Sequence, residues 1–166
     1  MDAGVLLARM VFGLLMAAHG TQKLFGWFGG FGLAGTAGFF EQLGFRPGRF
    51  FAATAAGTEI AAGLLLVLGL LGPLGPALIV SVMVVAMATV HWQHGLFAQN
   101  NGIEVPLLYT VAAAAIALTG PGAYSVDALL GFTWSAAVVW VALGLGLLGG
   151  FANLAVRKAE PSAAAV

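Results

Sequence analysis

Five long apolar segments, interrupted by few ionisable residues, constrain this sequence more than any other feature. About 20 helical residues cross the roughly 30 Å hydrocarbon core of a bilayer. Hydrophobic residues make up 61% and charged residues 7% of the 166 residues, a composition far from that of a soluble domain. We therefore predict an all-α membrane protein with spans at about residues 4–25, 50–71, 77–94, 105–118 and 132–156.

The expected architecture is a four-helix transmembrane bundle with a fifth C-terminal transmembrane helix. Residues 4–130 would form the bundle and residues 131–156 the additional helix. Residues 157–166 would form a disordered tail, because they have almost nothing to bury. In the fifth segment, Gly146 and Gly150 have the GxxxG spacing that allows close helix contact. Glycine is so abundant, with 25 copies, that coincidence explains this spacing equally well.

The connection between the first two spans is long and rich in Phe, Trp and Gly. Amphipathic aromatic rings settle at the interface between a membrane and water. We predict a short interfacial helix near residues 36–43, ended by Gly44, with Pro47 leading into the second span.

Charge and cysteine content exclude several functional classes. Six basic and six acidic residues balance, and no dense basic cluster exists to hold nucleic-acid phosphates, so nucleic acid is not an expected partner. The chain has no cysteine, which excludes thiol redox relays and Cys-ligated metal or iron–sulfur centres. The lipid bilayer is the expected partner, and a homo-oligomer is compatible with the sequence.

Most ionisable residues fall on one side of the membrane when the spans are traced in alternating directions. We call it side B, the side opposite the N-terminus. His19 and Lys23 share a helical face near side B, Glu59 lies near the middle of the second span, and His91 closes the third. An intramembrane charge costs about 2.5–3.5 kcal/mol, so Glu59 must be neutral, paired or near water. We predict that these four residues form a polar pocket that opens to side B.

A purely structural interpretation competes with this prediction. A pair of Glu59 with His19 or Lys23 can simply fix the register of two helices, and Lys23 can extend to the lipid headgroups. Arg9, isolated near the other side, is also expected to extend to the headgroups.

Small residues on the second span indicate where a helix would approach Glu59. Ala53, Gly57 and Ala61 recur every four residues, so they would let a neighbouring helix come close.

A metal site is the alternative use of the histidines. His91 and His94 lie on adjoining turns, with His19 and Glu59 as further candidate ligands. No carboxylate in the pattern would orient these imidazoles, which ligand histidines usually require. We therefore predict no metal.

Four motifs occur in order: RMVFGLLMAAHGTQKLFGWFGG, TEIAAGLLLVLGLLGPLG, VHWQHG and TGPGAYSVD. With them, residues 4–130 resemble the DoxX family of small bacterial integral membrane proteins. The resemblance implies a four-helix bundle in the bacterial cytoplasmic membrane. It also implies a link to the membrane subunit of a thiosulfate:quinone oxidoreductase and to oxidative stress. The family pattern falls on His19, Gly20, Gln22, Lys23, Glu59, Gly63, His91, Gly120, Pro121 and Gly122.

These residues lead to a functional hypothesis: a membrane subunit of an oxidoreductase system that holds a quinone or small redox substrate. The expected catalytic residues are His19, Glu59 and Lys23, and the expected substrate-binding residues are Gln22, His91 and Gly63. A buried carboxylate and imidazole can exchange protons with a quinone, and an ammonium can stabilise a developing anion. No covalently bound cofactor is expected, so electrons would come from a partner redox protein.

Two other functional classes remain open. The same Glu59 and His19 could act as the proton relay of a small-solute or proton-coupled transporter. The protein could instead be a non-catalytic membrane scaffold for partner proteins. Orientation is open too: the Lys and Arg count of the loops places side B in the cytoplasm, whereas the resemblance implies a cytoplasmic N-terminus.

Overall fold

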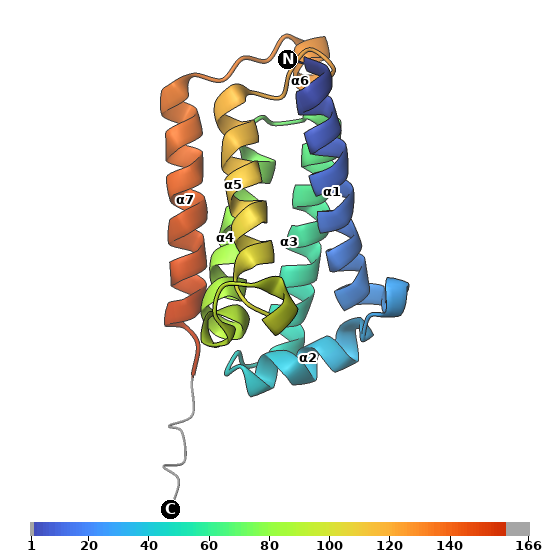
Figure 1. Cartoon of the computed structure of the whole chain (residues 1–166), viewed down its shortest axis with the longest axis vertical. Helices are drawn as coiled ribbons and strands as arrows, with labels where there is room; N and C mark the ends of the chain where they lie inside the picture. Colours follow the sequence, from blue (N-terminus) through green and yellow to red (C-terminus); the bar gives the residue numbers. More distant parts are fainter. Residues whose placement is uncertain (1, 159–166) are drawn as a thin grey trace, which may run out of the picture.

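The computed structural model describes residues 2–158. These residues form helices and connecting turns, and no strand occurs among them. The long helices lie side by side along one axis (Figure 1). They are α1 (Asp2–Phe25), α3 (Gly48–Leu68), α4 (Leu74–Ala86), α5 (Glu104–Thr119) and α7 (Ala136–Ala155). The short helix α6 (Val126–Leu130) lies at the N-terminal end of the bundle.

Four helical segments are long and apolar enough to cross a membrane: Asp2–Phe25, Gly48–Leu68, Leu74–His94 and Ala136–Ala155. The apolar helix α5 has only 16 residues, fewer than the roughly 20 that span a bilayer. Large apolar side chains such as Leu7, Leu14, Val141 and Leu148 are exposed on the outside of the bundle. The all-helical, multi-pass membrane architecture expected from the sequence is therefore confirmed, with lipid as its surroundings.

Several predicted boundaries are shifted. The second span begins at Gly48 and ends at Leu68, because Gly69 adopts a left-handed conformation that caps the helix. The third span begins at Leu74 and changes after Ala86 into a π-helix, Met87–His91, and a 3₁₀ turn, Trp92–His94. The last helix begins only at Ala136, where Ser135 accepts a hydrogen bond from the backbone of Val138.

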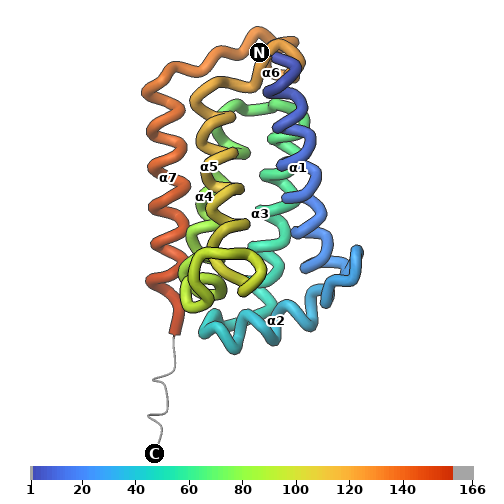
Figure 2. The backbone as a smooth tube through the Cα atoms, in the orientation of Figure 1, coloured from blue at the N-terminus to red at the C-terminus, as the bar shows by residue number. Residues whose placement is uncertain are grey.

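A helix is present in the first connection, but it is longer than expected. Helix α2 comprises Gly32–Gln42 and begins four residues before the predicted start. It crosses the end of the bundle opposite the N-terminus, on side B (Figure 2). We call this end the α2 end.

Helices α1 and α3 approach each other through glycines that the sequence interpretation had not assigned to a helix contact. A Cβ atom on Gly63 would lie 2.5 Å from the carbonyl oxygen of Gly13, and one on Gly20 would lie 2.6 Å from that of Ala56. Gly57, by contrast, has open space around it. The predicted contact face on Ala53, Gly57 and Ala61 is therefore wrong; the adjacent stripe of small residues faces α1.

The glycine pair in the last helix does make a close contact. Gly146 and Gly150 are buried. A Cβ on Gly146 would lie 2.4 Å from the carbonyl oxygen of Ala77, and one on Gly150 would lie 2.8 Å from Cβ of Val84. Helix α7 is thereby packed against α4 at these two positions.

Arg9 does not extend to the headgroups, contrary to our prediction. Its side chain is 1% exposed. The guanidinium donates four hydrogen bonds to backbone carbonyl oxygens, of Leu66 (2.9 Å), Val67 (2.7 Å), Pro121 (2.6 Å) and Tyr124 (3.0 Å). Arg9 thus joins α1 to the end of α3 and to the loop after α5.

Asp127 completes this cluster and was missed from the sequence. Its carboxylate, 0% exposed, accepts hydrogen bonds from the backbone amides of Leu71 and Gly72 and from the indole of Trp134. Its own amide donates to the carbonyl oxygen of Gly69. The turn between α3 and α4 is thereby held to α6 and to the loop before α7.

Residues 157 and 158, which we assigned to the disordered tail, are hydrogen-bonded to the turn after α2. The Arg157 guanidinium donates to the carbonyl oxygen of Leu43, and the backbone amide of Lys158 donates to that of Gly44. These bonds hold the end of α7 to the turn after α2. Residues 159–166 lie outside the described residues.

The substitution Gly63→Ala tests the α1–α3 contact. We expect it to lower the free energy of unfolding by about 1–3 kcal/mol, because the methyl group would overlap backbone atoms of α1. Thermal unfolding in detergent would measure the loss. Gly57→Ala on the same helix is the matched control: the added methyl meets no neighbour and alanine favours the helix, so the transition temperature should stay the same or rise. Equal effects of the two substitutions would contradict the contact.

The substitution Arg9→Lys tests the carbonyl cluster. An ammonium group has three donors and no planar fork, so it cannot serve four carbonyl acceptors at these positions. We expect a loss of about 2 kcal/mol or more, from buried acceptors left without partners, measured by thermal unfolding in detergent. Arg49→Lys, at an exposed position, is the control. A similar small effect at both sites would argue against the cluster.

Candidate functional site

A cavity of about 780 Å³ lies at the α2 end of the bundle. Its walls come from α1, α2, α3, α4 with its π-helical extension, and α5, with Asn153 from α7. Most of the lining surface is apolar, and the polar side chains within it include His19, Gln22, Lys23, Glu59, His91 and Tyr109. An apolar cavity with a few convergent polar groups is the usual form of a small-molecule site.

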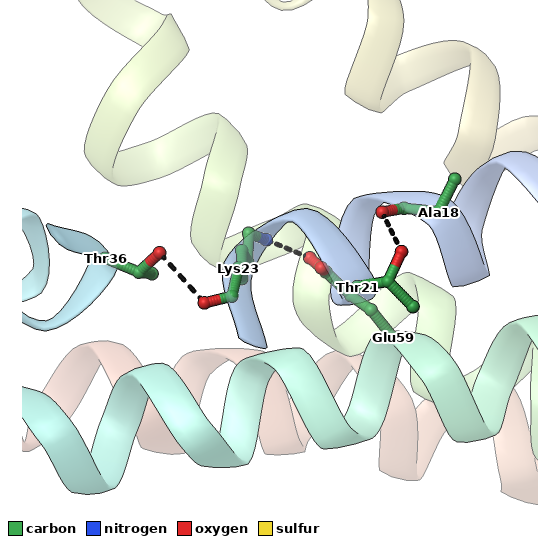
Figure 3. Close-up of polar contacts among 5 residues, drawn as sticks. All are labelled: Ala18, Thr21, Lys23, Thr36 and Glu59. Atoms are coloured by element: carbon green, nitrogen blue, oxygen red, sulfur yellow. Dashed lines mark hydrogen bonds and ion pairs between the residues drawn. The ribbon is translucent and has the colours of Figure 1, made fainter. Parts of the chain in front are cut away.

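Glu59 and Lys23 form an ion pair at the cavity wall. Lys23 Nζ, near the end of α1, contacts Glu59 Oε1 on α3 (Figure 3). Glu59 is 1% exposed, whereas the side chain of Lys23 is 31% exposed. The pair therefore runs from the packed interior toward the more open end of the bundle.

The second carboxylate oxygen of Glu59 is unpaired among the described residues. Within residues 2–158, Glu59 Oε2 has no hydrogen-bond partner, although it is buried. Buried polar atoms nearly always have a partner, so an exception in a cavity wall requires an explanation.

Helix α2 is tied directly to this pair. The hydroxyl of Thr36, a buried residue of α2, donates to the carbonyl oxygen of Lys23 at 3.2 Å (Figure 3). Thr36 also lines the cavity. The helix that closes the end of the bundle is therefore linked to the residue that carries the ammonium group.

His19 lies in the same cavity but does not pair with Glu59. Its ring contacts Tyr109 edge to face, with centroids 6.1 Å apart. The described side chains provide no hydrogen bond to the ring nitrogens of His19. The sequence predicted either His19 or Lys23 as the partner of Glu59, and in the structure the partner is Lys23.

Tyr109 is a lining residue that sequence reasoning missed. It is 6% exposed and contacts both His19 and Phe12 through its ring. The available signal was that it is one of two tyrosines and lies inside an apolar span, where a phenol has few partners.

His91 and His94 have separate roles. His91 lines the cavity, and its Nδ1 lies 2.7 Å from the carbonyl oxygen of Asn101. His94 is exposed, and its Nδ1 lies 2.9 Å from the carbonyl oxygen of Val90. Across residues 2–158, no three His, Asp or Glu side chains are grouped as a metal site would require.

Of the other two predicted binding residues, one lines the cavity and the other does not. Gln22 lines the cavity, and its amide donates to the carbonyl oxygen of Phe28 at 3.3 Å. Gly63 does not line the cavity; it packs against Gly13 and Ala17 of α1.

The π-helix Met87–His91 forms one wall of the cavity. Thr89, at its centre, is buried, lines the cavity and bonds back to the carbonyl oxygen of Val85 at 2.8 Å. π-helical turns are rare, and they occur frequently at functional sites. The π-helix is therefore a second feature, independent of the ion pair, that indicates a functional site at this end of the bundle.

These features define a helical multi-pass membrane protein with a mostly apolar cavity and a buried ion pair at one end. The DoxX family model matches residues 4–92, more than half of the chain, and the chain belongs to the DoxX family. The match includes all six predicted site residues and stops before α5, short of the expected residue 130. No curated protein and no solved structure matches the chain.

The substitution Lys23→Met tests the ion pair. It would leave both oxygens of buried Glu59 without a partner, and we expect a loss of about 2 kcal/mol in unfolding free energy. This is less than the roughly 3–5 kcal/mol typical of a fully buried pair, because Lys23 is partly exposed. Thermal unfolding in detergent measures the loss.

The double variant Lys23→Met, Glu59→Met is the matched control. Replacing both charges with apolar side chains of similar size should recover most of the lost stability. Equal unfolding temperatures of the single and double variants would contradict this prediction, because they would mean that removing Lys23 leaves no uncompensated charge on Glu59.

Proposed function

We propose that this DoxX-family protein is a membrane subunit of an oxidoreductase system in the bacterial cytoplasmic membrane. Its cavity would bind a quinone or a small redox substrate beside Lys23, Glu59 and His19. The observation that carries the proposal is the buried ion pair in the wall of a mostly apolar cavity, with one carboxylate oxygen left unpaired.

The proposed chemistry is proton exchange with a bound quinone. Reduction of a quinone to a quinol takes up two electrons and two protons. The electrons come from a partner redox protein, since this chain has no cysteine for thiol chemistry. The two protons come from water at the α2 end: His19 and Glu59 each take up a proton and pass it to the ligand, and Lys23 stabilises negative charge that develops on a quinone oxygen. The remaining lining holds the apolar ring.

A proton-coupled transporter is the second candidate, and the shared cavity of Glu59 and His19 favours it. A transporter also needs a route to the other side of the membrane. A second cavity, at the Arg9 end, shares no lining residue with the first. Buried Met16, Ala62 and Ile79 belong to the packed core of the bundle. This packing favours a binding site closed on one side, and flux into liposomes without an electron donor would favour the transporter.

The topology we propose has five spans, with α5 as the fourth and α2 lying in the interface. Three exposed aromatic side chains, Trp27, Phe28 and Phe31, precede α2 and would anchor it there. Residues 4–130 would form the family bundle, and α7 would be an addition to it.

Five spans place the two ends of the chain on opposite sides of the membrane. Compartment-sensitive reporters fused before Asp2 and after Lys158 should therefore give opposite signals in cells. Equal signals would mean an even number of spans, with α5 excluded from the membrane as a full span. The same measurement determines which compartment faces the cavity.

Binding of a quinone analogue tests the proposed site. Wild-type protein in lipid nanodiscs should bind a decyl-benzoquinone, measured by quenching of intrinsic fluorescence. The variant Glu59→Gln, His19→Ala should bind it at least about 10-fold more weakly, because charge-assisted contacts are lost. The control is His94→Ala, since His94 lies outside the cavity lining. Equal affinity of the wild type and the double variant for the quinone would contradict the proposal.

A further inference from the structure

The starting observation is the unpaired oxygen of Glu59. Oε2 is buried and without a partner within the described residues, and Glu59 lines the cavity. The other oxygen, Oε1, is occupied by Lys23. A ligand bound against this ion pair would therefore find one carboxylate oxygen still without a donor from residues 2–158, beside the N–H groups of Lys23 that do not contact Glu59.

The chemistry of that atom determines what it can bind. A carboxylate paired with an ammonium group is ionised, and an ionised carboxylate has only acceptor sites. A ligand carbonyl oxygen, which is also an acceptor, would place lone pairs against lone pairs. A hydroxyl group would donate to Oε2 and supply the missing hydrogen bond.

The rest of the lining indicates the body of the ligand. Phe39, Phe45 and Phe51 come from the α2 and α3 side, and Val82 and Val105 from the opposite walls. An apolar ring with a short apolar chain fits such a lining, and its hydroxyl would point at the ion pair.

We infer that the cavity selects the hydroxyl-bearing, reduced form of its ligand: a quinol in preference to the corresponding quinone. This inference rests on the proposed function and specifies which member of the redox couple the site holds more tightly. A charge-assisted hydrogen bond gives a preference of about 10-fold or more.

The preference has a direct redox consequence. A site that binds quinol more tightly than quinone favours reduction of the bound quinone. For a two-electron couple, a 10-fold preference raises the reduction potential of the bound couple by about 30 mV. The site would therefore act as an acceptor for electrons from the partner protein.

Three probes on one scaffold test the inference with the full chain in lipid nanodiscs. They are a decyl-benzoquinol held reduced under anaerobic conditions, its quinone, and its dimethyl ether, which keeps the ring but cannot donate. The quinol should bind about 10-fold or more tightly than both others. This comparison needs no variant, so folding defects cannot obscure it.

The substitution Glu59→Gln adds a sharper requirement. If Lys23 keeps its bond to the amide oxygen, the amide NH₂ would face the cavity as a donor. The ratio of quinol affinity to quinone affinity should then fall at least about 10-fold, so that the quinone binds as tightly as the quinol or more tightly. Glu104→Gln is the matched control, because the Glu104 carboxylate bonds to the amide of Ala98 and lies outside the cavity lining.

The outcomes separate this inference from the proposed function. Equal binding of the three probes, lost in the Glu59→Gln, His19→Ala variant, would overturn the hydroxyl preference and retain the quinone site; Oε2 would then be satisfied by water. Tighter binding of the quinone would overturn it as well. If none of the probes binds, both proposals fail together.

Discussion

A charged side chain inside a bilayer must find its hydrogen bonds within the protein, because hydrocarbon offers none. This constraint is met in two different ways in the present bundle. Arg9 and Asp127 bond mainly to backbone groups at the end of α3, in the turn after α3 and in the loop after α5. Glu59 bonds to a single side chain and keeps one oxygen free. The first arrangement supplies every polar side-chain atom with a partner, whereas the second leaves one buried carboxylate oxygen without a donor in the described part of the chain.

Close packing of α1 on α3 is what makes the second arrangement possible. Lys23 and Glu59 are 36 residues apart, and their helices meet at Gly20 and Gly63 with no room for a Cβ atom. At a larger spacing, the ammonium and carboxylate would be separated by lipid or by other side chains. The glycines of the family pattern in these two helices therefore serve the site indirectly, since they set the distance between its charged groups.

The sequence predicted the helical class, the membrane location and the side of the bundle to which Lys23, Glu59 and His91 belong. These follow from apolar segment lengths and from alternating direction, which are local properties. The face of α3 could not be chosen, because Ala52 and Ala56 form a second stripe of small residues beside Ala53 and Gly57. The role of Arg9 was also beyond reach. Its acceptors Pro121 and Tyr124 are 112 and 115 residues away, in a loop whose position depends on the whole bundle.

The contrast between the two ends of the bundle bears on how the site can work. At the Arg9 end, a network of short polar contacts joins the turn after α3, the loop after α5 and the loop before α7. At the α2 end, the cavity is covered by a helix that Thr36 holds near its middle and Glu41 holds to the start of α3. Arg157 and Lys158 bond to the turn that follows it. Few bonds must break to move α2, whereas the opposite end would have to lose most of its buried hydrogen bonds. Ligand exchange is therefore expected from the α2 side, the side on which the ion pair is also partly exposed.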